Sequence, residues 1–374
     1  MKKVMFFIES LAPGGAERAL VNLLKSLDKG KYDLYVYTVT DEDIYQKEVT
    51  DLCHYRSFLN KKMYRNGGLS KLLFWVGIKF IYNAPVSLVY RLFIQGKYDV
   101  EVGFVEGFAT KLVSSSTNPN SKKIAWVHTD TMKNEYADNS FYNLKEQIEA
   151  YNRLNKIITV SDTVKESFER KYRISENIEV IHNIINIDEI INKSTEKIDC
   201  SLNKSLQMVT AGRLEQQKGF IRLIEILGHI KGKDYSLWII GDGSQKEEIK
   251  KRIEKYHLGE NVRLFGFQEN LYKYISKSDV FICSSYAEGY STAISESIIL
   301  GIPVFSVECS GVVEQLKEGM FGVIVPNTDT DLTRMLNELI NNPLMITRYK
   351  QNIANNHTEL QISDLEKIER LFDE

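Results

Sequence analysis

The stretch SDVFICSSYAEGYSTAISESIILGIPVFS, at residues 278–306, contains two short apolar runs separated by a polar loop and an apolar helical segment. The first run, VFIC, consists of apolar residues only, which is typical of a strand covered on both faces of a parallel sheet. The helical segment is predicted to begin near Ser291 or Thr292 and to end near Gly301, a C-terminal cap just before Pro303. A strand, a helix and a second strand in this order form a βαβ unit, so the stretch predicts a doubly wound α/β fold.

The same alternation of apolar strands and helical segments extends along most of the chain. We expect strands at residues 3–8, 32–39, 99–105, 123–127, 156–161 and 178–183, and again at 206–212, 235–241, 261–266, 279–285 and 302–307. The sequence therefore predicts an α/β protein with two doubly wound, Rossmann-like domains that face each other across a cleft. Such sheets bind ligands beyond the carboxyl ends of their strands, at the point where the strand order reverses.

The domain boundary is predicted from a polar segment without periodicity, NKSTEKIDCSLN. We expect a first domain at residues 1–192, a linker at 193–204 and a second domain at 205–345. The remaining residues, 346–374, are predicted to form a C-terminal helix that packs across the boundary between the domains.

The composition is that of a globular protein without a preference for nucleic acid. The chain has 374 residues, of which 43% are hydrophobic and 26% charged, and its net charge is −2. The four cysteines form no C-x-x-C pair, and the N-terminal apolar run ends at Glu9, too early for a signal peptide. We therefore expect free thiols, no membrane span and a cytoplasmic location.

Two glutamates occupy places where a carboxylate is costly unless it has a partner. Glu288 follows the VFIC strand, and Glu296 lies about one turn into the apolar helix. A carboxylate accepts hydrogen bonds from paired hydroxyl groups, such as those of a ribose or a hexose. An anionic phosphate is expected between them, at the N-terminus of the helix.

Two further turns have the composition of anion-binding sites. Gly14 and Gly15 follow the first strand and open a helix, where free backbone N–H groups favour an anion. In the second domain, Gly212 ends a strand, and Arg213 and Lys218 follow it in a loop. The arginine guanidinium presents several N–H donors in one plane, and the lysine ammonium is a compact positive charge. This pair therefore suits a diphosphate.

With these motifs, the chain resembles the retaining glycosyltransferases of family four, which have the GT-B fold. The matching segments follow the family order over most of the chain: PGGAERAL, AWVHTD, VSDTVKESF, GRLEQQKGF, WIIGDG, RLFGF, the stretch quoted first, and FGVIVP. The resemblance implies an acceptor-side first domain and a second domain that binds a nucleotide sugar, with a UDP-sugar as the expected donor. It also implies retention of the anomeric configuration, no metal and no cofactor.

Carried over residue by residue, the resemblance implies that Glu288 contacts the donor hexose and that Glu296 holds the ribose hydroxyls. Arg213 and Lys218 would neutralise the leaving diphosphate, and His128 would face the donor sugar. The other expected donor-binding residues are Gly14, Gly15, Gly212, Gly289, Tyr290, Ser291 and Thr292.

Four other readings compete with this one. A metal-dependent transferase of the GT-A type would use Asp41 and Asp43, which follow a strand. A non-catalytic GT-B subunit of another transferase is also compatible with the fold, although Glu288, Arg213 and Lys218 are all present. The missing G-x-G-x-x-G fingerprint counts against a nicotinamide dehydrogenase. A phosphorylase-like enzyme would need a cofactor lysine that cannot be identified in the sequence.

Residues 58–97 are strongly basic and contain no Asp or Glu. Their cations are Lys61, Lys62, Arg65, Lys71, Lys79, Arg91 and Lys97. Removing these seven charges from the net −2 leaves −9 on the remaining chain, so the charge is unevenly distributed. Aromatic and aliphatic residues between the cations predict a surface attracted to anionic lipid at the inner face of the cell membrane. The expected acceptor is then a lipid-linked saccharide in cell-envelope or capsular polysaccharide synthesis.

Overall fold

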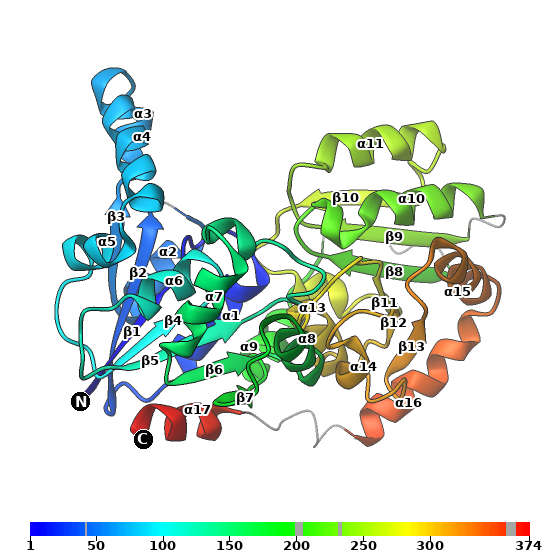
Figure 1. The fold of residues 1–374 in the computed structure, drawn as a ribbon. Coiled ribbons are helices and arrows are strands. Elements are labelled where there is room, and N and C mark those ends of the chain that lie inside the picture. The colour runs from blue at the N-terminus through cyan, green and yellow to red at the C-terminus, as the bar shows by residue number, and fades with distance from the viewer. Residues whose placement is uncertain (42, 199–204, 231–233, 357–363) are drawn as a thin grey trace. The chain divides into compact units, whose positions relative to one another are not determined.

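The computed structural model describes residues 1–41, 43–198, 205–230, 234–356 and 364–374, which divide into two compact units. The first unit comprises Met1–Ile184 with Ser363–Glu374, and the second comprises Ile185–Ile362. Each unit is a parallel sheet whose strands are connected through helices (Figure 1). The prediction of two doubly wound α/β domains is confirmed, whereas the cleft between them remains a prediction.

The sheet of the first unit has the strand order β3-β2-β1-β4-β5-β6-β7, and all its described pairings are parallel. Its order reverses between β1 and β4, so the ligand-binding position expected for this sheet lies beyond the carboxyl ends of these two strands. The strands are β1 (Lys2–Phe7), β2 (Tyr32–Thr40), β3 (His54–Leu59), β4 (Val100–Gly103), β5 (Lys122–Val127), β6 (Lys156–Thr159) and β7 (Ile178–Val180). The helices are α1 (Gly15–Ser26), α2 (Gln46–Leu52), α3 (Lys61–Arg65), α4 (Gly68–Asn83), α5 (Val86–Phe93), α6 (Phe108–Ser114), η1 (Asp138–Ser140), α7 (Leu144–Asn152), α8 (Asp162–Tyr172) and α17 (Leu365–Asp373).

The sheet of the second unit has the order β10-β9-β8-β11-β12-β13, which reverses between β8 and β11. The strands are β8 (Leu206–Ala211), β9 (Tyr235–Ile240), β10 (Val262–Gly266), β11 (Val280–Cys283), β12 (Val304–Val307) and β13 (Gly322–Val325). The helices are α9 (Ile187–Ser194), η2 (Gln216–Lys218), α10 (Phe220–His229), α11 (Lys246–Lys255), α12 (Tyr272–Ile275), α13 (Thr292–Ile299), α14 (Val312–Gln315), α15 (Asp329–Asn341), η3 (Pro343–Met345) and α16 (Ile346–Asn355). We use the term switch point for the position beyond the strand ends where the order of each sheet reverses.

The division between the units lies earlier in the chain than the predicted end of the first domain at residue 192. The reason is that α9 packs in the second unit, where Ile190 forms a small buried cluster with Tyr272 and Ile299. Of the predicted linker at 193–204, residues 199–204 lie outside the described part of the chain. The C-terminal segment also differs from one continuous helix: α16 belongs to the second unit, and α17 belongs to the first.

The last helix, α17, is fastened to the first unit by apolar and ionic contacts. Phe372 meets the rings of Phe6 and Tyr32 edge to face, with centroid distances of 6.0 Å and 5.9 Å. Asp364, just before α17, accepts a hydrogen bond from the backbone N–H of His182 at 2.9 Å and lies 2.8 Å from its Nδ1. Residues 364–374 therefore complete the core of the first unit.

Helix α13 begins and ends as the sequence predicts. Ser291 is its N-cap residue, and Gly301 follows the helix with φ = 75°, a left-handed conformation that glycine adopts without strain. The N–H of Gly301 bonds to the carbonyl of Ile298, and the N–H of Ile302 bonds to the carbonyl of Ser297. These two bonds form a Schellman motif, which stops the helix before β12.

Helices α3 and α4 stand out from the rest of the first unit as a pair (Figure 1). On α4, only Phe74 and Ile81 are buried, while Leu69 is 71% exposed and Trp75 is 48% exposed. Among the described residues, no helix is both long enough and apolar enough to cross a membrane. We call residues 61–83 the α3–α4 projection.

Candidate active site

The switch point of the second unit brings together two of the predicted site residues. Lys218, at the end of η2, extends its Nζ to both carboxylate oxygens of Glu288, at 2.7 Å and 2.9 Å. Ser285, which follows β11, donates its hydroxyl to the same carboxylate. Glu288 is 7% exposed, so its charge is balanced by Lys218 rather than by water.

Glycines allow the two loops to approach so closely. Gly219 has φ = 66°, and a Cβ atom there would lie 2.1 Å from the carbonyl oxygen of Ser284. The predicted site residue Gly212 lies under the aliphatic part of Lys218, whose Cε would be 3.3 Å from a Cβ at that position. A side chain at residue 219 would therefore push the start of α10 away from the loop that follows β11.

A small pocket lies at this switch point, with an empty volume of about 220 Å³ that includes open solvent. Its polar lining includes Lys218, Ser285, Glu288 and Ser291, and its apolar lining includes Phe220 and Phe281. Three of the predicted site residues, Lys218, Glu288 and Ser291, therefore share one pocket between β8 and β11.

The two arginines of this region have different environments. The predicted site residue Arg213 is exposed, and hydrogen bonds from Ser244 followed by the charge of Arg213 lower the pKa of the Glu215 carboxyl. Arg222, on α10, is 4% exposed and donates to the carbonyls of Ser284 and Ser285 at 2.8 Å and 3.2 Å. Arg213 is thus open to a ligand, whereas Arg222 is used to hold the loop after β11.

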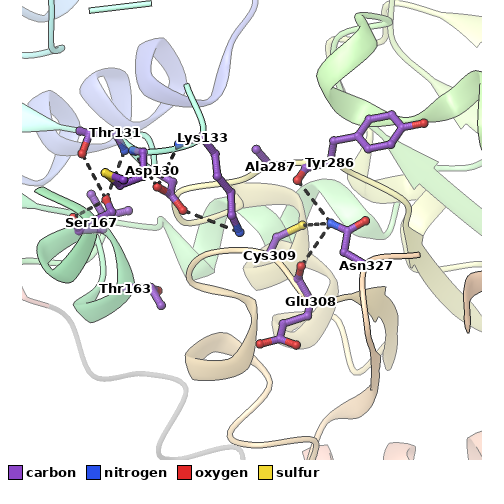
Figure 2. A network of polar contacts seen from close by, with 12 residues as sticks. Asp130, Thr131, Lys133, Thr163, Ser167, Tyr286, Ala287, Glu308, Cys309 and Asn327 are labelled. Atoms are coloured by element: carbon purple, nitrogen blue, oxygen red, sulfur yellow. Dashed lines mark hydrogen bonds and ion pairs between the residues drawn. The ribbon is translucent and has the colours of Figure 1, made fainter. Parts of the chain in front are cut away.

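Asn327, after β13, also contacts this loop, and Figure 2 shows it beside Tyr286, Glu308 and Cys309. Its Nδ2 lies within hydrogen-bond distance of the carbonyls of Ser285, Tyr286 and Glu308, at 3.1–3.3 Å, and of the Cys309 sulfur at 3.3 Å. Its Oδ1 accepts a hydrogen bond from Arg222, at 2.9 Å. The backbone that carries Glu288 is therefore held by hydrogen bonds from both Arg222 and Asn327.

The predicted donor residues at the start of α13 are held by a second set of contacts. Gln315 accepts a hydrogen bond from the N–H of Ser291 at 3.0 Å and donates one to its carbonyl at 2.8 Å. Gly289 is buried, and a Cβ at Gly311 would lie 2.1 Å from its carbonyl oxygen. Tyr290 and Thr292, on either side of Ser291, are half-buried.

Glu296 lies farther along α13 and is 3% exposed. The hydroxyl of Tyr272 donates a hydrogen bond to its Oε1, at 3.0 Å. An ionised carboxylate has about four lone-pair positions, so it can accept several hydrogen bonds at once. Glu296 is therefore compatible with the predicted binding of ribose hydroxyls, although that role remains a prediction.

The remaining predicted site residues belong to the first unit. Gly14 is the N-cap of α1, and Gly15 is exposed, with no atom within 4 Å of the position of a Cβ. His128 follows β5 and is 8% exposed, and its two ring nitrogens have no hydrogen-bond partner within the described part of the chain. Burial lowers the pKa of His128 to about 3, so the imidazole is neutral at physiological pH.

The loop that carries His128 is rigidly attached. The buried carboxylate of Glu106, after β4, accepts hydrogen bonds from the backbone N–H of His128, at 2.9 Å, and from the Thr129 hydroxyl. The carboxylate of Asp130 caps the following turn, and Thr131 bonds to Ser167 on α8 (Figure 2). The buried neutral imidazole of His128 is thus held in a fixed position.

The acidic residues proposed for a metal-dependent reading have partners within the protein. Asp41 accepts a hydrogen bond from the backbone N–H of Lys61 at 2.6 Å, and Asp43 accepts one from Leu11 at 3.0 Å. Asp43 also forms an ion pair with the Lys61 side chain. Within the described ranges, no group of three or more His, Cys, Asp or Glu residues could hold a metal ion.

Sequence reasoning identified Lys218 and Glu288 but missed the residues that hold them. Arg222 could have been found as a charged residue within the apolar run GFIRLIEIL, since a charge there needs a buried partner. Asn327 and Gln315 bond mainly to backbone groups, and such bonds leave no recognisable pattern in the sequence.

Comparisons with known proteins agree with the fold and with the motifs. The family model Glycosyltransferase Family 4 matches residues 13–189, and the model Glycosyl transferases group 1 matches residues 192–357. The N-acetylgalactosamine-N,N'-diacetylbacillosaminyl-diphospho-undecaprenol 4-alpha-N-acetylgalactosaminyltransferase of Campylobacter jejuni is 28% identical over 331 residues. That alignment covers 87% of this chain and 86% of the relative.

Two solved structures show the same fold along the whole chain. HepE of Anabaena, in complex with UDP and glucose, is 17% identical, with a TM-score of 0.72 over 100% of this chain and 98% of HepE. A TarM variant of S. aureus, in complex with fondaparinux, alpha-GlcNAc-glycerol and UDP, is 15% identical, with a TM-score of 0.74 over 100% of both chains. The chain therefore belongs to the family four glycosyltransferases, the glycosyl transferases group 1, and has the GT-B fold that these motifs predict.

Proposed function

We propose that the protein is a retaining glycosyltransferase that moves a hexose or hexosamine from a UDP-sugar to a saccharide acceptor. The observation that carries this proposal is the Lys218–Glu288 pair at the switch point of the second sheet. The pair places a cation and a hydroxyl-binding carboxylate next to each other, which suits the junction between a diphosphate and a sugar. The complexes of HepE and TarM with UDP support uracil as the base of the donor nucleotide.

The chemistry required of this site is mainly electrostatic. Transfer breaks the bond between the anomeric carbon and a diphosphate oxygen, which keeps the electron pair. It forms a bond from that carbon to the acceptor oxygen, whose hydroxyl proton passes to the leaving diphosphate or to solvent, and negative charge develops on UDP. The Lys218 ammonium and the exposed Arg213 guanidinium stabilise this charge, together with the N-terminus of α13. Glu288 binds a hydroxyl of the donor sugar, and Glu296 binds the ribose.

In this proposal Lys218 and Arg213 stabilise the charge on the leaving diphosphate, the role that a divalent metal has in metal-dependent transferases. Asp41 and Asp43 already accept hydrogen bonds from backbone groups and from Lys61, which supports a structural role for both. The resemblance assigns Gly15 to the phosphates or the sugar of the donor and His128 to the donor sugar, and these two assignments stay predictions.

We further propose that the acceptor is a lipid-linked saccharide used in envelope or capsular polysaccharide synthesis. The support is the α3–α4 projection, which exposes Leu69, Leu72 and Trp75 beside the exposed Lys71 and outside the core of the first unit. Large exposed apolar residues among cations favour the interface of an anionic membrane. The undecaprenol in the name of the Campylobacter jejuni relative agrees with this choice of acceptor.

The donor is tested by measuring UDP release from UDP-glucose, UDP-galactose, UDP-GlcNAc and UDP-GalNAc, with and without EDTA. We expect one donor to be hydrolysed or transferred in the presence of EDTA and to protect the protein from thermal unfolding. The anomeric proton signal of the product should report retention. Lys250→Met, which removes an exposed lysine of α11 paired with Glu247, serves as the control for Lys218→Met.

The possible outcomes separate the competing readings. Loss of activity with EDTA and recovery with manganese would restore the metal-dependent reading. Thermal protection by UDP without turnover of any donor would favour the non-catalytic subunit. No binding of UDP at all would contradict the proposal.

The membrane contact is tested by co-sedimentation with vesicles containing phosphatidylserine. Lys61 is unsuitable for this test because it pairs with Asp43, so we choose charge reversal at Lys62, Lys71 and Lys79, which are exposed. Binding should weaken by about 1 kcal/mol per cation, and the difference should shrink with added salt. Charge reversal at Lys250, Lys251 and Lys255 on α11 is the matched control. Equal binding of both triple variants would contradict the membrane proposal.

A further inference from the structure

Glu9, at the carboxyl end of β1, is held between two tyrosines at the switch point of the first sheet. The hydroxyl of Tyr82, near the end of α4, donates to Glu9 Oε2 at 2.6 Å. The hydroxyl of Tyr136, in the segment between β5 and η1, donates to Glu9 Oε1 at 2.6 Å. Three segments that are distant in the sequence therefore meet at one half-buried carboxylate.

The two tyrosine rings are fixed in place but remain accessible. The ring of Tyr82 lies 4.7 Å from that of Phe108, and a Cβ at Gly107 would lie 3.4 Å from the Tyr136 ring. Tyr82 is 45% exposed and Tyr136 is 49% exposed, although their hydroxyl groups are bonded. Aromatic rings that keep this much surface in water, while their polar ends are fixed, form a rigid platform for a ligand.

The charge at this position is unfavourable for phosphate. Burial and then the charge of Glu9 raise the pKa of the Tyr136 hydroxyl, and the charges of Glu106 and Glu17 add to this effect. Three carboxylates therefore act on the same region, and an anionic group would be repelled there. Neutral hydroxyl groups, in contrast, donate readily to carboxylate oxygens.

We propose that Glu9, Tyr82 and Tyr136 form a subsite that binds one sugar ring of the acceptor. The apolar C–H face of the pyranose packs on the tyrosine rings, and its hydroxyl groups bond to Glu9, whose carboxylate oxygens each accept a hydrogen bond from one tyrosine and have a second lone pair. The subsite rests on the proposed function for its acceptor role. It also lies where a doubly wound sheet places its ligand, beyond β1 at the point where the strand order reverses.

The test is saturation-transfer NMR with the methyl α-glycosides of glucose, galactose, GlcNAc and GalNAc in the presence of UDP. We expect the wild-type protein to bind at least one glycoside, and Tyr82→Ala and Tyr136→Ala to weaken that binding about tenfold or more. Tyr82→Phe and Tyr136→Phe keep the rings and should retain most of the binding. Tyr142→Ala, which removes another exposed tyrosine of this unit, is the matched control and should bind as the wild type does.

A purely structural tie between α4, β1 and the loop after β5 makes a different prediction. Such a tie depends on the tyrosine hydroxyl groups. Each Phe variant would then weaken glycoside binding as much as the Ala variant does, and both would lower the melting temperature equally. That result would overturn the proposal, as would a wild-type protein that binds none of the glycosides, or Ala variants that bind them normally. UDP binding is measured on the same samples and tests the proposed function separately. A wild-type protein that does not bind UDP would contradict the proposed function, whereas the glycoside measurement alone decides the subsite.

Discussion

The two sheets share one strand order up to their sixth strand but carry different charged groups at their switch points. In the first unit, the position beyond β1 and β4 has the carboxylates of Glu9 and Glu106. In the second unit, the position beyond β8 and β11 has Lys218 paired with Glu288 and the exposed Arg213 nearby in the chain. The backbone of each unit forms a switch point at the same place in its strand order, and the side chains there determine which group binds.

The difference indicates a division of roles between the units. A diphosphate is favoured where cations and the N-terminus of α13 come together, and it is disfavoured among carboxylates. Sugar hydroxyl groups are favoured where carboxylates have spare lone pairs and aromatic rings are exposed. The predictions below test this division, beginning with the largest expected effect.

Replacing the Lys218–Glu288 pair by the neutral pair Lys218→Met and Glu288→Gln should lower kcat/KM by about 10²–10³-fold. The reason is that the charge on the leaving diphosphate loses its cation. The double variant should keep nearly the stability of the wild type, because both members of a buried pair are replaced together. Steady-state UDP release and thermal unfolding measure the two effects.

The single variant Lys218→Met provides the control for that experiment. It leaves the Glu288 carboxylate buried without its cation, so it should lower the free energy of unfolding by about 1–3 kcal/mol. A double variant that stays active would show that the pair is a structural ion pair only.

Asn327→Ala should have an intermediate effect, since Asn327 holds the loop of Glu288 without touching the proposed donor. We expect a loss of about 1–3 kcal/mol in the free energy of unfolding, from several hydrogen bonds worth about 1 kcal/mol each. The KM for the donor should rise more than kcat falls, because the loop is less well positioned. Asn341→Ala, which removes a single exposed bond to Asn337, is the matched control and should change neither quantity.

His128 should make the protein less stable in acid. Its pKa is about 3 in the folded protein, below the ordinary value of about 6.5 expected in the unfolded chain. As the pH falls below 6.5, the unfolded chain binds a proton that the folded protein does not, so stability is lost at about 1.4 kcal/mol per pH unit. This loss ends when the pH reaches the folded pKa.

His128→Phe should remove this contribution while keeping an aromatic ring beside Phe104 and Trp126. Urea unfolding at pH 7 and pH 5 measures it as the difference between variant and wild type. An identical pH dependence of His128→Phe and wild type would contradict the burial of a neutral imidazole.

The fold was predictable where local signals are strong. Continuous apolar strands and the capping signals of α13 mark the βαβ units, and these expectations are confirmed. Strand β3 was missed because its segment, HYRSFL, mixes charged and apolar residues at the edge of the sheet. The early start of the second unit was also missed, because the packing of α9 depends on residues far along the chain, such as Tyr272.

The candidate site was predictable only as single residues. The motifs named Lys218 and Glu288 separately, but their ion pair depends on the close approach of two loops at Gly219. The contacts of Glu9 with Tyr82 and Tyr136 join three distant segments, so neither spacing nor periodicity could reveal them. Such contacts follow from the topology of the sheet, which brings the ends of distant strands to one edge.

The most direct test of the division between the two switch points is the dissociation constant of UDP, measured by isothermal titration calorimetry. The neutral pair Lys218→Met with Glu288→Gln should raise this constant about tenfold or more, whereas Glu9→Gln should leave it unchanged. An unchanged constant for the neutral pair, or an equal change in Glu9→Gln, would contradict the assignment of the diphosphate to the second unit.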